Sequence, residues 1–170
     1  MPDSVTPPSA VQPVDVDVDL QVPAQRRELT GATLEMLSVI SLGGVFGTLA
    51  RYGLGVAFPH GAAGFPWATF AVNVAGCGLI GVLMVCIDQR GAHRLVRPFL
   101  GVGVLGGFTT FSTYVVEVQE AMAAGAARLA LAYLGGTLAA AVVAVLAGSA
   151  LTSTLIRVLT RAGRHRPKEW

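Results

Sequence analysis

Apolar residues gather in four long stretches of the chain, at residues 36–58, 66–87, 98–118 and 128–156. Each stretch has about the 20 residues that an α-helix needs to cross the ~30 Å hydrocarbon core of a bilayer. Short connections separate the stretches, at residues 60–64, 88–97 and 119–127, and they leave no room for a soluble domain. The pattern predicts an all-α integral membrane protein with four transmembrane helices over residues 36–156.

The third stretch contains a segment that is poorly suited to a helix. Gly106 and Gly107 precede a run of β-branched and hydroxyl residues, all weak helix formers. We therefore expect a break in this helix, which at membrane depth is tolerated only where the backbone is buried in protein or lines a cavity. Freed carbonyls can bind a cation, and the hydroxyls of Thr110, Ser112 and Thr113 can donate to an anion.

Composition supports the membrane assignment. Hydrophobic residues make up 53% of the 170 residues and charged residues only 13%, against about 25% in soluble domains. Two GxxxG pairs, Gly43 with Gly47 and Gly103 with Gly107, have the spacing that lets membrane helices approach closely. The chain has no P-loop, HExxH or GxSxG motif, so we expect a protein that is not an enzyme.

Polar residues inside the spans are candidates for a pore. Asn73 lies in the middle of the second span, and Thr69 precedes it by four residues on the same helical face. Asn73 could form an interhelical hydrogen bond, or it could face a pore and donate to an anion without carrying a full charge. In the fourth span, Tyr133 and Thr137 share a face in the same way.

Aromatic and charged residues add to these candidates. Phe111 and Tyr114 are three residues apart, so they lie roughly on one face, and the edges of their rings carry partial positive charge. Arg51 and Glu117 are the strong charges within the spans, and we expect both toward the outer ends.

The distribution of basic residues predicts the orientation. Ten of the twelve Lys and Arg residues lie in three regions that four spans place on one side, so both termini are expected in the cytoplasm. Residues 1–35 include five prolines and an alternating Val–Asp run, which predicts a disordered tail. Residues 157–170 form a basic cytoplasmic tail. The basic residues on the cytoplasmic side are Arg26, Arg27, Arg90, Arg94, Arg97, Arg157, Arg161, Arg164, Arg166 and Lys168.

Three motifs together resemble one family. They are GGVFGTLARY at residues 43–52, FPWAT at 65–69 followed by Asn73 and Gly76, and GGFTTFSTYVVE at 106–117. Over residues 36–156 the chain resembles the bacterial fluoride-specific ion channels, the Fluc or CrcB family. The resemblance implies an antiparallel, dual-topology dimer in the inner membrane, with two narrow pores that pass fluoride. No nucleic-acid partner is expected.

The resemblance also implies roles for individual residues. Asn73 would be the pore amide and Phe111 an aromatic residue that meets fluoride edge-on. The backbone carbonyls of Gly106 and Thr109 would hold a structural Na⁺ at the dimer centre. The family usually has Phe where this chain has Tyr114, whose hydroxyl could donate to fluoride or could narrow one pore. Further implied positions are Thr110 and Ser112 near the path, Tyr133 and Thr137 as a polar track, and Arg51 and Glu117 near the entrances.

The implied function is passive export of fluoride, because the sequence shows no energy source for transport. Fluoride would leave a cell into which HF has diffused, driven by the negative membrane potential. Two alternatives stay open: a proton-coupled exporter of small cations, for which Glu117 is the candidate carboxylate, and a non-conducting scaffold subunit. Because the charge bias favours one orientation, we hypothesise a heterodimer with an oppositely inserted paralogue.

Overall fold

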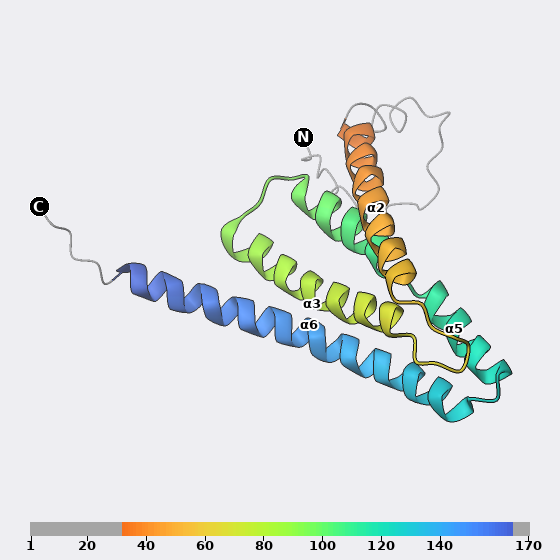
Figure 1. Cartoon of the computed structure of the whole chain (residues 1–170). Helices are drawn as coiled ribbons and strands as arrows, with labels where there is room; N and C mark the ends of the chain where they lie inside the picture. The colour runs from red at the N-terminus through yellow and green to blue at the C-terminus, as the bar shows by residue number, and fades with distance from the viewer. Residues whose placement is uncertain (1–31, 165–170) are drawn as a thin grey trace, which may run out of the picture. The chain divides into compact units, whose positions relative to one another are not determined.

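The computed structural model describes residues 32–164, and the regular structure of that part of the chain is helical. Four helical segments are long and apolar enough to cross a membrane: Leu34–Ala57, Trp67–Gln89, Arg97–Ala123 and Ala127–Arg161. The four predicted spans are therefore confirmed. The elements are α2 (Ala32–Ala57), α3 (Trp67–Arg90), η1 (Arg97–Leu105), α4 (Gly106–Phe108), α5 (Ser112–Ala123) and α6 (Ala127–Arg164) (Figure 1).

Three helices continue beyond their predicted ends. Helix α3 reaches Arg90, α5 reaches Ala123 and α6 reaches Arg164, so the connections are shorter than residues 88–97 and 119–127. With 38 residues, α6 is about 57 Å long at 1.5 Å per residue, well beyond the ~30 Å hydrocarbon core. It must tilt or extend beyond the bilayer. Residues 32–35 of the predicted N-terminal tail and 157–164 of the predicted C-terminal tail are helical, and the remaining tail residues lie outside the described part of the chain.

The third span is broken, as predicted, but the break lies after the glycine pair. Gly106 and Gly107 are helical, and the helix ends at Phe108 because Thr109 is extended, with φ −75° and ψ 160°. Helix α5 resumes at Ser112. The first part of the span, η1, is π-helical, a feature that the sequence pattern did not predict. Its glycines and β-branched residues are weak α-helix formers, and π-helical turns are often found at functional sites.

Glycines bring the helices into close contact, as the GxxxG spacing predicted. A Cβ atom at Gly43 would lie 3.0 Å from the Cα of Gly103, and one at Gly107 would lie 3.0 Å from the Cα of Gly44. The α2 backbone therefore packs directly on η1 and α4. Helices α3 and α6 run side by side and meet in the same way where Gly78 faces Gly148 (Figure 1). Such packing associates helices in lipid, where there is no hydrophobic driving force between them.

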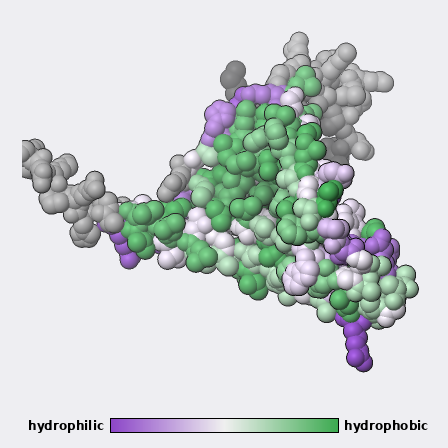
Figure 2. Space-filling view, in the orientation of Figure 1, coloured by the Kyte–Doolittle hydropathy of each residue, from purple (hydrophilic) through white to green (hydrophobic). Residues whose placement is uncertain are grey.

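The surface is largely apolar. Leu34, Leu37, Leu138 and Leu151 are among many large apolar side chains that are more than half exposed. Figure 2 shows this hydrophobic surface over much of the visible face, with hydrophilic residues concentrated in a few places. A soluble monomer rarely exposes so large an apolar area. Together with the four spans, it identifies a multi-pass membrane protein.

Candidate functional site

A cavity of about 270 Å³ lies beside the break in the third span, between α3, α5 and α6. We call it the break cavity. Several predicted pore residues come together here, from α3, from the extended segment at the break and from α6. The polar and aromatic residues that line it are Asn73, Thr109, Thr110, Phe111, Tyr114 and Thr137.

Asn73 bridges α3 to the broken backbone. Its amide nitrogen donates to the Thr110 carbonyl at 2.9 Å, and its amide oxygen accepts from the Thr110 N–H at 2.8 Å. The side chain thus satisfies the N–H and the carbonyl of Thr110, two of the backbone groups that the break releases. A carboxamide has two N–H donors, and one of them finds no partner among residues 32–164. Asn73 therefore forms the interhelical hydrogen bonds and still has one N–H donor that could bind an anion.

Thr137 also lines the break cavity from α6. Its side chain is 5% exposed, and its hydroxyl oxygen is buried without a hydrogen-bond partner in the described part of the chain. Buried polar groups in proteins are nearly always bonded, so this hydroxyl beside the break cavity is a candidate hydrogen-bond donor to a ligand. Tyr133, four residues earlier on the same face, is 1% exposed but bonds elsewhere.

The two aromatic residues differ in environment. Phe111 is 77% exposed at the edge of the break cavity, whereas Tyr114 is buried. The Tyr114 hydroxyl donates to the Leu134 carbonyl of α6, and its ring lies 6.0 Å from Phe111 and 5.1 Å from Tyr133 between centroids. The hydroxyl that we expected to donate to an anion or to narrow the path is therefore bonded to the α6 backbone.

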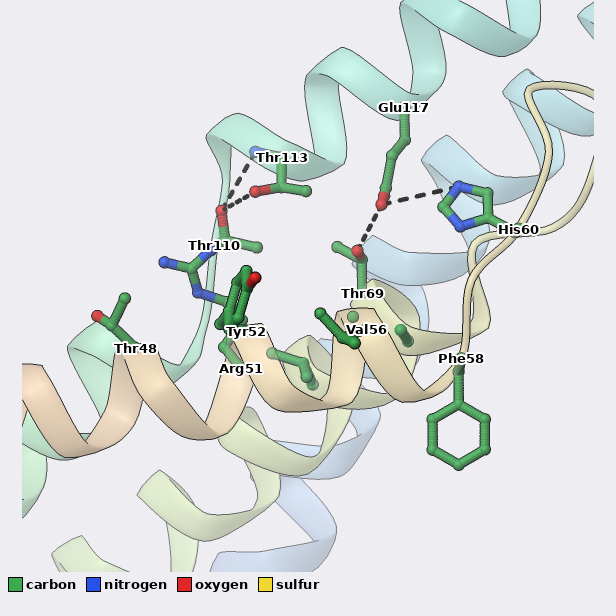
Figure 3. A pocket seen from close by; sticks show the side chains of 13 residues that line it. Thr48, Arg51, Tyr52, Val56, Phe58, His60, Thr69, Thr110, Thr113 and Glu117 are labelled. Carbon is green, nitrogen blue, oxygen red and sulfur yellow. Dashed lines mark hydrogen bonds and ion pairs between the residues drawn. The ribbon is translucent and has the colours of Figure 1, made fainter.

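A second cavity, of about 350 Å³, opens between α2, the α2–α3 connection, α3 and α5 (Figure 3). We call it the entrance cavity. Arg51 and Glu117 both line it. The Arg51 Nε donates to the Gly107 carbonyl at 3.2 Å, whereas Glu117 accepts hydrogen bonds from two hydroxyl groups. Thr110 lines both cavities, so both lie against the broken helix. The polar residues lining the entrance cavity are Thr48, Arg51, His60, Thr69, Thr110, Thr113 and Glu117.

Glu117 lies at the centre of a buried cluster. The Thr69 hydroxyl donates to one carboxylate oxygen at 2.6 Å, and the Tyr133 hydroxyl donates to the other at 2.7 Å. The His60 Nε2 lies 3.9 Å from the oxygen that Thr69 also contacts. The sequence predicted Thr69 and Tyr133 along the fluoride path and Glu117 near an entrance. In the structure, hydrogen bonds connect all three residues. His60 was assigned no role, because its position in a short connection carried no signal.

The remaining predicted residues have more local surroundings. The Thr110 hydroxyl accepts from the Thr113 N–H at 3.2 Å and so caps the start of α5. Ser112 is exposed and contacts only the Thr110 hydroxyl, at 3.4 Å, within the described chain. Gly106 and Thr109 line a small cavity of about 170 Å³ behind the break, together with Gly76. Because both residues line the same cavity, their backbone carbonyls are candidate ligands for a single cation.

The fold and these cavities define a class: a small multi-pass membrane protein whose polar sites surround a broken transmembrane helix. Comparison with known proteins identifies the family. The family model described as "CrcB-like protein, Camphor Resistance (CrcB)" matches residues 38–149. The chain belongs to this family, and the family assignment made from its motifs is confirmed.

Several curated relatives are similar over most of their length. A protein of Streptomyces avermitilis named "Fluoride-specific ion channel FluC 2" is 52% identical over 122 residues, which cover 71% of this chain and 77% of the relative. A protein of the same name from Nocardia farcinica is 51% identical over 131 residues, covering 76% and 91%. One from Thermobifida fusca, also named FluC 2, is 47% identical over 122 residues, covering 71% and 90%.

Proposed function

We propose that this protein is a fluoride-specific ion channel subunit that lets fluoride leave the cell passively. The names of its relatives support this function. The observation that carries it is the break cavity, where the buried Thr137 hydroxyl has no partner in the described chain and Asn73 retains a free donor. These donors and Phe111 line one cavity.

The chemistry of these donors suits fluoride. The ion is small and strongly hydrated, so a pore must replace its water with several donors of moderate strength. A full positive charge would hold the ion too tightly for release, whereas amides, hydroxyls and ring edges permit both entry and exit. Asn73 and Thr137 would bind the anion in the break cavity, and Thr110, which lines both cavities, would pass it to the entrance cavity, where Arg51 attracts it toward the outside. The membrane potential supplies the driving force outward.

An antiparallel dimer would complete the pore. Phe111 and the apolar residue Leu138 lie exposed at the rim of the break cavity, where a second subunit would cover them. Because ten of the twelve basic residues favour one orientation, the partner would be an oppositely inserted paralogue. Streptomyces avermitilis has two relatives, named FluC 2 and FluC 3, so numbered paralogues do occur together in one organism. Both termini of the present chain would face the cytoplasm.

We also propose a structural Na⁺ in the small cavity behind the break, which Gly106 and Thr109 line. Sodium takes uncharged oxygen ligands, and broken membrane helices commonly offer backbone carbonyls for it. The carbonyls of Gly106 and Thr109 would hold the ion and fix the two half-helices relative to each other. Replacing Na⁺ with a large organic cation is then expected to lower the melting temperature of the protein.

The experiment that tests the function is fluoride efflux from liposomes, followed with a fluoride electrode and compared with chloride. Purified protein is expected to release fluoride and not chloride, and Asn73→Asp and Phe111→Ile are expected to abolish release. Efflux from this chain alone would rule out an obligatory heterodimer. If this chain alone gives no efflux and adding an opposite-topology paralogue restores it, the pair is established. If no efflux occurs even with the paralogue present, the non-conducting scaffold is favoured.

A further inference from the structure

His60 provides a titratable group beside the buried Glu117. The imidazole lies in the α2–α3 connection, its side chain is 25% exposed, and its Nε2 is 3.9 Å from the carboxylate. In Figure 3 the ring points into the entrance cavity toward Glu117, on the side opposite Arg51. Imidazole is the side chain whose ordinary titration falls between pH 5 and 8.

The other groups facing this cavity do not neutralise Glu117. Thr69 and Tyr133 donate to the carboxylate through uncharged hydroxyls. Arg51, from α2, also lines the cavity, but its Nε donates to the Gly107 carbonyl, and within the described chain Arg51 forms no ion pair with Glu117. Tyr52 lines the same wall of the cavity and is exposed. Among the residues lining the entrance cavity, His60 is therefore the basic side chain placed closest to Glu117.

We propose that His60 regulates the entrance by its charge, so that acid increases the flow of fluoride. This inference rests on the proposed function. When His60 is neutral, the negative charge of Glu117 offsets the attraction that Arg51 exerts on an anion. When His60 is protonated, it pairs with Glu117 and leaves the field of Arg51 uncompensated.

The location gives this response a use. In the proposed orientation, the α2–α3 connection faces the outside, on the side opposite the three basic regions. External acid converts fluoride to HF, which diffuses into the cell and dissociates there. The same acid would protonate His60 and raise the rate at which fluoride passes through the entrance cavity. Export would then increase when more HF enters the cell.

The test is fluoride efflux from liposomes at equal internal and external pH, at pH 8 and pH 6, with HF leakage through protein-free liposomes subtracted. One unit charge acting across about 6 Å of water changes the local anion concentration about three-fold. Wild-type efflux is therefore expected to be about three-fold faster at pH 6, and the difference is expected to shrink in 1 M salt, where the Debye length is about 3 Å.

Three variants separate charge from structure. His60→Gln is expected to give the slow rate at both pH values, and His60→Lys the fast rate at both. His93→Gln is the matched control, since His93 lies in the connection between α3 and η1, and it is expected to retain the wild-type response. Equal wild-type rates at the two pH values, or an unchanged pH response in His60→Gln, would overturn the inference while leaving the channel function intact. Absence of fluoride efflux at both pH values would overturn the proposed function, and the inference with it.

Discussion

Replacing Thr137 with valine separates conduction from stability. Valine has nearly the shape of threonine but lacks the hydroxyl. In this structure the Thr137 hydroxyl is buried in the break cavity and has no partner among the described residues. The substitution therefore removes a group that the folded chain does not use but that a permeating anion would.

Thr137→Val is expected to raise the stability of the protein and to lower the rate of fluoride efflux. An unbonded, buried hydroxyl costs about 1–3 kcal/mol of desolvation, so Thr137→Val is expected to raise the free energy of unfolding by about 1 kcal/mol. For a chain of this length that corresponds to a rise of about 2–4 °C in the melting temperature. A hydrogen bond to a charged partner is worth about 1.5–3 kcal/mol, so fluoride efflux is expected to fall about 10-fold to 100-fold.

The assay compares thermal unfolding in detergent with fluoride efflux from liposomes on the same preparations. Thr152→Val is the matched control, because Thr152 lies farther along α6, outside the break cavity, and its hydroxyl donates to the Gly148 carbonyl at 2.7 Å. The control is expected to leave efflux unchanged. Wild-type efflux in Thr137→Val, or a loss of stability there, would refute the reasoning that this hydroxyl serves the anion.

Other substitutions test the break, the packing and the aromatic pair. Asn73→Leu leaves the N–H and carbonyl of Thr110 unbonded and is expected to lower the free energy of unfolding by about 2–4 kcal/mol, measured by thermal or denaturant unfolding; unchanged stability would contradict the bridging role. Gly47→Ala would push its Cβ into the backbone of the third span and is expected to lower the free energy of unfolding by about 1–3 kcal/mol. Gly53→Ala is the control, because open space surrounds this position, and it is expected to raise the free energy of unfolding by about 0.5 kcal/mol in the same measurement. Tyr114→Phe removes a bond to the α6 backbone and is expected to cost about 1 kcal/mol while fluoride efflux stays unchanged; a large fall in efflux would show that the hydroxyl serves the ion.

Local sequence was sufficient for the elements of the fold. Apolar runs of this length favour spanning the membrane, and the poor helix formers after Gly107 predict the break from local sequence alone. Spacing also gave correct neighbours within a helix: Tyr133 and Thr137 are four residues apart and are both buried. The glycine pairs predicted close contact because a missing side chain permits it in any arrangement.

Contacts between helices depended on the tertiary structure. How far each helix rotates about its axis, and where two helices cross, is set by the packing of all four together, so no local pattern contains it. That packing directs the Tyr114 hydroxyl to Leu134, joins Thr69 and Tyr133 at Glu117, and brings His60 to the same carboxylate. The sequence alone thus determined which residues lie in the membrane and which are polar there. Only the tertiary structure decided which of them satisfy one another and which, like Thr137, find no partner among the described residues.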